Sequence, residues 1–202
     1  MKTPTELAQL RADIRFEETL CGRRFCFSST WGLFSPRGID DGTRLLVDHL
    51  DLPANADCLD LGCGYGPIGL VMAHLAPAGH TLMLDKDFVA VDYAGRNAQD
   101  NGLGHASARL SNGFAHLDPQ HRFDAIASNL PAKVGKELLT LYLHDAHARL
   151  RPGGRLYLVT INGLREFIKR NLHEVFGNYD KLKQGRNYTV ALARRLPYCE
   201  ND

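Results

Sequence analysis

Three glycines follow an acidic residue at the point where a short apolar run ends. The run Cys58–Leu61 leads into Gly62, Gly64 and Gly66, and Pro67 starts the helix-like stretch that comes next. Glycines at a strand-to-helix turn let the backbone approach a ligand closely, and proline is common at the first position of a helix. The segment therefore predicts a ligand-binding turn at the carboxyl end of a strand, with a tight chain reversal that binds nothing as the alternative.

The acidic residue of this turn, Asp60, limits the kind of ligand. Counted from Gly62, the third glycine of a G-x-G-x-x-G dinucleotide turn would fall where Pro67 stands. A carboxylate at Asp60 would also repel a pyrophosphate, whereas it attracts a sulfonium and an ammonium group. S-adenosylmethionine carries both cations, so the turn favours this cofactor over NAD.

A second acidic residue, Asp85, ends the next apolar run and lies about 20 residues after Gly62. This is the place where an acidic side chain accepts hydrogen bonds from ribose hydroxyls in related nucleotide folds. A solvated strand end is the alternative for Asp85. Together with Asp60 and the strand-to-helix turn, it favours a nucleoside ligand.

The elements around these residues alternate from residue 57 onward. Short apolar runs alternating with amphipathic helices indicate a parallel sheet that is covered on both faces. The strand-like runs are Cys58–Leu61, Thr81–Leu84, Ala106–Leu110, Phe123–Ser128 and Arg155–Ile161. The helix-like runs are Ile68–Leu75, Phe88–Asn101, Glu137–Leu150 and Arg165–Val175.

The two ends of the chain complete the predicted fold. Thr3, Pro4 and Glu6 form a capping box for a helix over 3–20, before a strand at 25–27 and a helix over 43–50. Gly153 and Gly154 predict a turn before the fifth strand, and two strand-like runs in 179–194 predict an antiparallel hairpin. We expect an α/β, Rossmann-like doubly wound sheet, mostly parallel with that hairpin at its end. Residues 1–55 form an N-terminal extension packed on a catalytic domain, 56–202.

Composition excludes several classes of function. The 202 residues carry a net charge of +1, so binding to a polyanion needs a local basic face. Five scattered cysteines without a CxxC pair argue against disulfides and a zinc site, and predict a reducing, cytoplasmic environment. No secretion signal and no membrane-spanning apolar run is present in the sequence. His144 and His147 are more typical of a solvated helix than of a metal site, so we expect no metal.

The segment 60–69, D-L-G-C-G-Y-G-P-I-G, resembles the cofactor motif of class I methyltransferases. It is most similar to the small-subunit ribosomal RNA guanine-N2 methyltransferase family and its stand-alone, single-domain relatives. The resemblance runs from about Phe25 to Arg195. It includes G-L-F-S and D-D-G-T upstream, at 32–35 and 40–43, and R-P-G-G at 151–154. The family implies a soluble enzyme that uses S-adenosylmethionine.

The resemblance also assigns roles to cofactor residues. Asp60 and the glycines line the amino-acid end of the cofactor, and Asp85 holds the ribose. Asn112 stands where the family often has an aspartate against the adenine amine, and an asparagine oxygen can accept the same bond. The cofactor-binding set implied in this way is Asp60, Gly62, Cys63, Gly64, Asp85, Lys86, Asn112, Gly113 and Asn129.

The sequence Asn129-Leu130-Pro131-Ala132 occupies the position of the family's Asn-Pro-Pro-aromatic motif. In the family, the asparagine oxygen and the next carbonyl hold both hydrogens of an exocyclic amine and aim its nitrogen at the methyl group. The resemblance makes Asn129, Leu130 and Pro131 the catalytic residues. Leu130 and Ala132 depart from the motif, and Ala132 removes the aromatic that stacks on a flipped base. A local side-chain turn beside Pro131 is the alternative for Asn129.

Four N-terminal residues are candidates for substrate binding. Trp31 and Phe34 either stack on a base, replacing the missing aromatic, or pack the N-terminal segment onto the sheet. Asp40 and Thr43 either approach the cofactor or the target amine, or Asp40 or Asp41 caps a helix. Basic residues gather between 165 and 195, which fits a phosphate-tracking face or an ordinary charged surface.

Three functions remain open from these residues. The first is methylation of an exocyclic amine of a nucleobase, with guanine in ribosomal RNA as the target and RNA as the partner. The second keeps the methyl transfer but changes the substrate to a small molecule or another RNA, because of Ala132. The third is a cofactor-binding module without catalysis that serves as an RNA-binding or partner subunit.

Overall fold

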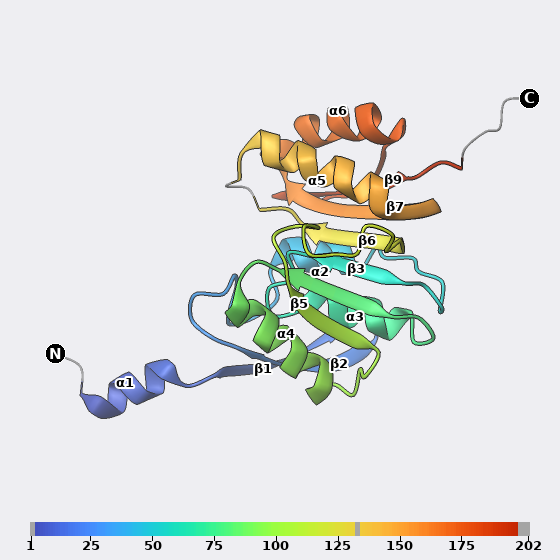
Figure 1. The fold of residues 1–202 in the computed structure, drawn as a ribbon. Helices are drawn as coiled ribbons and strands as arrows, with labels where there is room; N and C mark the ends of the chain where they lie inside the picture. The colour runs from blue at the N-terminus through green and yellow to red at the C-terminus, as the bar shows by residue number, and fades with distance from the viewer. Residues whose placement is uncertain (1–2, 132–133, 198–202) are drawn as a thin grey trace, which may run out of the picture.

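The structure, a computed structural model, describes residues 3–131 and 134–197. Its centre is a seven-stranded sheet in the order β5-β4-β3-β6-β7-β9-β8 (Figure 1). The strands are β3 Cys58–Leu61, β4 Thr81–Asp85, β5 Ala106–Leu110, β6 Phe123–Asn129, β7 Leu150–Ile161, β8 Asp180–Gln184 and β9 Tyr188–Arg194. Strands β3 to β7 pair in parallel, and β9 pairs antiparallel with both β7 and β8. The predicted fold class, a mostly parallel sheet with a C-terminal antiparallel hairpin, is confirmed.

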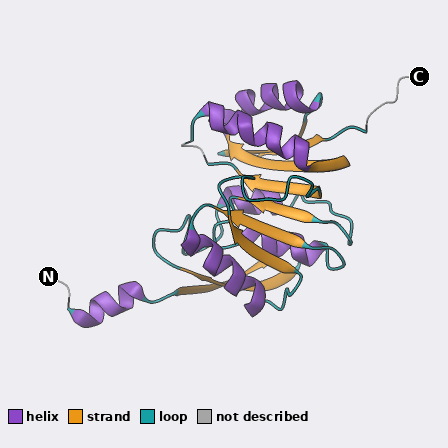
Figure 2. Cartoon of the chain, in the orientation of Figure 1, coloured by secondary structure: helices purple, strands orange, loops and turns teal. Residues whose placement is uncertain are grey.

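Helices cover both faces of this sheet (Figure 2). Buried side chains of α2 Asp41–Val47, α3 Pro67–Leu75 and α4 Phe88–Asp100 share one apolar core. Those of α5 Lys136–Arg149 and α6 Arg165–Phe176, which follows the short 3-10 turn Asn162–Leu164, share the other. Neighbouring residues of β3 show the alternation that makes this possible, because Cys58 belongs to the first core and Leu59 to the second. None of the helices within the described residues is long and apolar enough to cross a membrane.

The N-terminal segment differs from its prediction. The capping box forms, with Thr3 Oγ1 accepting from the Glu6 amide, but helix α1 covers only Pro4–Arg11. The predicted helix over 3–20 is wrong in its second half, where β1 Ile14–Leu20 pairs antiparallel with β2 Arg23–Ser29.

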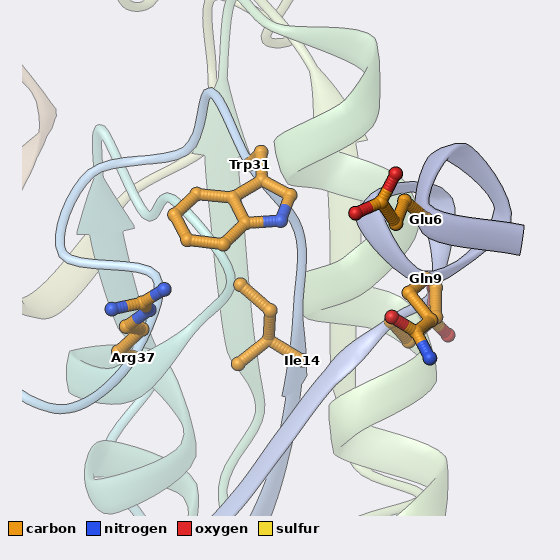
Figure 3. Close-up of a pocket in the computed structure, with 7 residues that line it drawn as sticks. Glu6, Gln9, Ile14, Trp31 and Arg37 are labelled. Atoms are coloured by element: carbon orange, nitrogen blue, oxygen red, sulfur yellow. The ribbon is translucent and has the colours of Figure 1, made fainter. Parts of the chain in front are cut away.

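The alternation of inward-facing and exposed side chains explains why Ile14–Leu20 forms a strand and not a helix. Ile14, Phe16, Glu18 and Leu20 face inward while the residues between them are exposed, and this is the period of a strand. The turn between β1 and β2 consists of Cys21 and Gly22, which both have positive φ, at 47° and 77°. Two such residues suit the right-handed twist of a tight hairpin. Beyond the hairpin, Trp31 faces α1 across a hollow (Figure 3).

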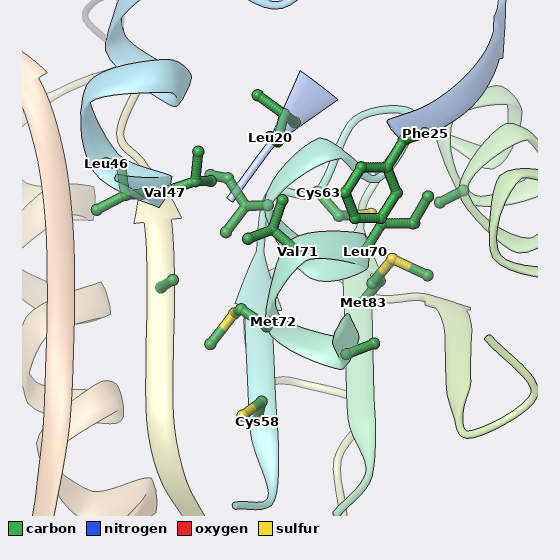
Figure 4. Close-up of a cluster of buried hydrophobic side chains, with 14 of the residues drawn as sticks. Leu20, Phe25, Leu46, Val47, Cys58, Cys63, Leu70, Val71, Met72 and Met83 are labelled. Atoms are coloured by element: carbon green, nitrogen blue, oxygen red, sulfur yellow. The ribbon is translucent and has the colours of Figure 1, made fainter. Parts of the chain in front are cut away.

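The β1–β2 hairpin packs into the same apolar core as helix α3 and the sheet face that α3 covers. Figure 4 shows Phe25 of β2 beside Leu70 and Val71 of α3, with Met83 of β4 nearby. These four side chains are fully buried. The β1–β2 hairpin therefore rests on the helix that follows the glycine-rich turn.

The turn predicted at Gly153 and Gly154 lies inside β7 and does not precede it. Strand β7 already begins at Leu150, and its register with β6 shifts between Phe123 and Ala125. Gly153 has φ of 80°, donates to the carbonyl of Arg195 at 2.7 Å and thereby stays tied to the chain beyond β9. The glycines form a bulge, where the extra residues leave the ladder and the strand then continues.

Candidate functional site

The glycine-rich turn joins β3 to α3 at the carboxyl edge of the sheet. Gly62, Gly64 and Gly66 all have positive φ, at 76°, 55° and 97°. The amides of Gly62 and Cys63 donate to the carbonyl of Leu84 at 2.8 and 3.0 Å, which ties the turn to β4. A Cβ atom added at Gly62 or Gly64 would meet nothing within 4 Å. The positive φ angles require glycine here, and the space in front of the turn is open for a ligand.

Asp60 lies in β3 directly behind this turn, with no exposed surface. Its Oδ2 accepts from the Gly69 amide at 2.8 Å, whereas its Oδ1 has no hydrogen-bond partner among the described residues. Burial raises the pKa of Asp60 to about 7, against the lowering effect of the Gly69 amide. A buried carboxylate oxygen without a partner is costly, and a nearby cation would relieve that cost. The residue fits the ammonium and sulfonium charges expected of the cofactor.

Asp85 braces the turn from the next strand. Its Oδ2 accepts from the Gly64 amide at 2.9 Å, and its Oδ1 accepts from the Asp87 amide at 3.0 Å. The side chain is half-buried, and Lys86 beside it is exposed. The predicted ribose residue therefore also holds the glycine-rich turn in shape, a role that spacing in the sequence did not reveal.

The predicted adenine residues lie next to the end of β4. The amide of Ser111 donates to the Asp85 carbonyl at 2.8 Å, which brings Asn112 and Gly113 to this edge. Asn112 is exposed, and Gly113 has φ of 57°. A Cβ at Gly113 would lie 2.8 Å from the Tyr142 ring, so a side chain there would collide with α5.

One aromatic at this edge was missed as a site residue by sequence reasoning. Phe88 is the first residue of α4 and is 71% exposed, three positions after Asp85. An aromatic that far in solvent is unusual, and an apolar face for a planar ligand is one use for it. The feature of the sequence that could have indicated Phe88 is an aromatic residue directly after the N-cap Asp87. At this first position of the helix the side chain does not pack into the core.

Asn129 ends β6 at the same edge and meets the start of α2. Its Nδ2 donates to both carboxylate oxygens of Asp40 at 3.0 Å and to Thr43 Oγ1 at 3.1 Å. Asp40 is at the same time the N-cap of α2, because its two oxygens accept from the Thr43 amide at 3.0 and 3.1 Å. The structure thus joins three of the predicted catalytic and substrate residues, and the helix cap expected of Asp40 is confirmed.

Of the other residues in the motif Asn129-Leu130-Pro131-Ala132, the structure describes Leu130 and Pro131. The Leu130 amide donates to the carbonyl of Val159 at 3.0 Å, and the Leu130 side chain is buried while Pro131 is exposed. Ala132 lies outside the described residues.

Tyr65 connects the glycine-rich turn to the segment before α2. Its hydroxyl donates to the carbonyls of Ser35 and Gly38 at 3.1 and 3.0 Å, and its ring is buried. Its own carbonyl accepts from Asn97 Nδ2 at 2.8 Å, which anchors the turn to α4. Burial raises the pKa of Tyr65, so the hydroxyl stays protonated and donating. Sequence reasoning did not single out Tyr65.

Trp31 and Phe34 lie on the segment that leads into Asp40, and both are exposed. The contacts of Trp31 are with Arg37, whose Cζ lies 4.5 Å from the indole centroid, and with the hollow beside α1. Phe34 is 67% exposed. Within residues 3–131 and 134–197, no group of three His, Cys, Asp or Glu side chains is placed to hold a metal ion.

Comparison with known proteins agrees with this geometry. Residues 24–192 match the family described as methyltransferase small domain. The uncharacterized protein YbxB of Bacillus subtilis is 30% identical over 180 residues, which is 88% of this chain and 89% of that protein. The ribosomal RNA small subunit methyltransferase C of Hamiltonella defensa is 31% identical over 163 residues, or 79% of this chain and 47% of that protein.

A solved structure matches the fold closely. The T. thermophilus 16S rRNA N2 G1207 methyltransferase, in complex with AdoMet and guanosine, has a TM-score of 0.82 and 29% identity, over 91% of this chain and 50% of that one. The chain thus spans about half the length of the two ribosomal RNA methyltransferases that it matches. Because the family model covers most of its residues, the chain belongs to the methyltransferase small domain family and is a class I, S-adenosylmethionine-dependent methyltransferase.

Proposed function

We propose that this enzyme methylates an exocyclic amine of a nucleobase in RNA, and that the target is N2 of a guanine in ribosomal RNA. The observation that carries the proposal is the orientation of the Asn129 side chain. A carboxylate can only accept hydrogen bonds, so the amide nitrogen of Asn129 must face Asp40, and its oxygen must face away. An outward amide oxygen at the end of β6 is the acceptor that an amine substrate needs.

Two acceptors prepare such an amine for transfer. Asn129 Oδ1 takes one amine hydrogen and the Leu130 carbonyl takes the other, which holds the nitrogen in line with the methyl group. The cofactor supplies an activated methyl group on a sulfonium. The amine nitrogen forms the new bond to the methyl carbon, the sulfur–carbon electrons return to sulfur, and the amine proton leaves to water. Both acceptors favour the positive charge that develops on nitrogen, so no strong base is needed.

The residues that we propose for the cofactor surround the glycine-rich turn. Asp60 Oδ1 faces the cationic end, Asp85 accepts from the ribose, and the exposed Asn112 accepts from the adenine amine. Phe88 offers an apolar face to the adenine ring. The open space before Gly62 and Gly64 is what a bound nucleoside requires.

The relatives support guanine as the target. One matched enzyme is a 16S rRNA N2 G1207 methyltransferase with guanosine bound, and a second is a ribosomal RNA small subunit methyltransferase. Cytoplasmic location is part of the proposal, and the cysteines at 21, 26, 58 and 63 are free thiols that fit a reducing compartment. Residues 1–55 are proposed to act as an extension that supplies Asp40 and Thr43 to the catalytic residues of 56–202.

A transfer assay with tritium-labelled S-adenosylmethionine tests this function. Ribosomal RNA, guanosine and a metabolite extract are offered separately to the wild type and to Asn129→Ala, and cofactor affinity is measured by calorimetry. We expect label in RNA that Asn129→Ala reduces about 100-fold or more, with a much smaller loss of cofactor affinity. Label only in metabolites would support a small-molecule methyltransferase, and binding without transfer would support a non-catalytic subunit.

A further inference from the structure

A hollow of about 360 Å³ opens between helix α1 and the segment that follows β2 (Figure 3). In this view Trp31 and Arg37 lie on one side of it, Glu6 and Gln9 on the other, and Ile14 between them. Ala12 and Asp13 complete the lining. We propose that this hollow binds an unpaired nucleobase of the RNA that flanks the target base. The inference rests on the proposed function and assigns a second contact for the same RNA strand.

Stacking chemistry is the first argument. The indole of Trp31 is 45% exposed, although tryptophan usually buries most of its ring. Arg37 lies over that ring at 4.5 Å from its centroid and is itself exposed. An exposed aromatic beside a cation is the combination that binds single-stranded nucleic acid, because the ring stacks on a base and the cation attracts the backbone.

The second argument is that the stacking surface is held in place. Tyr65 donates to the carbonyls of Ser35 and Gly38, and Leu33 between Trp31 and Ser35 is buried. Asp13, which also lines the hollow, accepts hydrogen bonds from the Tyr93 hydroxyl at 2.5 Å and from the Arg96 guanidinium at 2.6 Å. A preorganised surface loses little conformational entropy when a ligand binds.

The opposite wall can recognise the edge of a base. Gln9 offers an amide with both donors and an acceptor, as Watson–Crick edges require. Glu6 uses Oε2 in the capping box with Thr3, which leaves Oε1 as an acceptor toward the hollow. The volume of 360 Å³ lies within the range of small-ligand sites.

Connectivity links the hollow to the site of methyl transfer. The segment that carries Trp31 and Arg37 runs directly into Asp40, which contacts Asn129. A strand whose target base reaches Asn129 would therefore place a neighbouring nucleotide over this segment. One stretch of chain, 31–40, thus lines the hollow, contacts the glycine-rich turn through Tyr65 and contacts Asn129 through Asp40.

Trp31 is the only tryptophan of the chain, so its fluorescence reports on the hollow alone. A single-stranded oligoribonucleotide that contains guanine is titrated into the protein, and binding is followed in parallel by anisotropy of a labelled copy. We expect quenching of the tryptophan emission at the concentrations where anisotropy rises. Binding of the oligoribonucleotide with unchanged emission would overturn the inference, and is the result expected if the hollow binds a protein segment.

Variants separate this inference from the proposed function. Trp31→Leu should raise the oligoribonucleotide KM about 5-fold or more while methylation of free guanosine stays unchanged, and Trp31→Phe should restore the KM. Leu141→Ala, which changes an exposed apolar side chain on α5 outside the hollow, is the matched control. An unchanged KM in Trp31→Leu, or an equal loss with guanosine, would contradict a flanking subsite. If no substrate is methylated, the proposed function fails while the quenching experiment still decides the inference.

Discussion

At the scale of single residues, Asp40 determines what Asn129 can do. Asp40 binds the Asn129 amide nitrogen with both oxygens and also caps α2 through the Thr43 amide. The sequence indicated Asp40 as a residue near the amine or as a helix cap, and the structure shows the cap together with a contact to Asn129. This pairing could not be predicted from spacing, because 89 residues separate the partners and only the folded sheet brings them together.

Replacing Asp40 by asparagine separates the two roles. Asparagine is an equally good N-cap, but its amide can present either a donor or an acceptor to Asn129. We expect Asp40→Asn to lower kcat about 10-fold or more, with thermal unfolding and cofactor affinity little changed. Steady-state kinetics check this, with Asp41→Asn, the exposed neighbouring carboxylate, as control. A loss confined to KM would show that Asp40 binds substrate and does not orient Asn129.

Asp60 gives a prediction about pH. Its pKa is about 7 in the folded protein because of burial, and an unfolded aspartate titrates near 3.9. Between these values the folded state holds a proton that the unfolded state has lost, so this residue's stabilisation is complete below about pH 4 and disappears as pH rises through 7. Without cofactor, the wild type should lose about 2–3 kcal/mol between pH 5 and pH 8 relative to Asp60→Asn. Urea unfolding at both pH values measures the difference, and parallel profiles would refute it.

At the scale of elements, the apolar strands were predictable and the N-terminal hairpin was not. Strands such as Cys58–Leu61 are short, apolar and followed by glycine, so their type and place follow directly from the sequence. The segment Ile14–Leu20 carries the adjacent acids Glu17 and Glu18, which interrupt the alternation of apolar and polar residues, and a strong capping box just before it favours helix. Pairing with β2 and burial of Phe16 against Phe27 outweigh that local preference.

The packing of α3 on β4 depends on a glycine in the first turn of the helix. A Cβ at Gly69 would lie 2.4 Å from Met83 Cγ and 3.2 Å from Asp60 Oδ2. We expect Gly69→Ala to destabilise the protein by about 1–3 kcal/mol in urea unfolding, because the buried Met83 has to move. Gly95→Ala is the matched control in α4, where the nearest neighbour of a Cβ is 4.0 Å away. That change should stabilise by about 0.5–1 kcal/mol, and equal effects in both helices would contradict the packing argument.

At the scale of the whole molecule, the carboxyl edge of the sheet collects every part of the proposed reaction. The glycine-rich turn after β3, Asp85 at the end of β4 and Asn129 at the end of β6 meet there because the strands are parallel. The segment before α2 crosses the same edge, tied to the turn by Tyr65 and to Asn129 by Asp40. This layout explains why the cofactor was predictable from one motif, whereas the substrate depends on contacts between distant segments.

Nucleoside analysis identifies directly the atom that receives the methyl group. Small-subunit ribosomal RNA is incubated with the enzyme and S-adenosylmethionine, digested to nucleosides and examined by mass spectrometry against synthetic standards. The proposed arrangement of Asn129, Asp40 and the Leu130 carbonyl predicts N2-methylguanosine, at a level that Asn129→Ala abolishes. Methyl groups found only on ring nitrogens, on ribose or on bases other than guanine would contradict it.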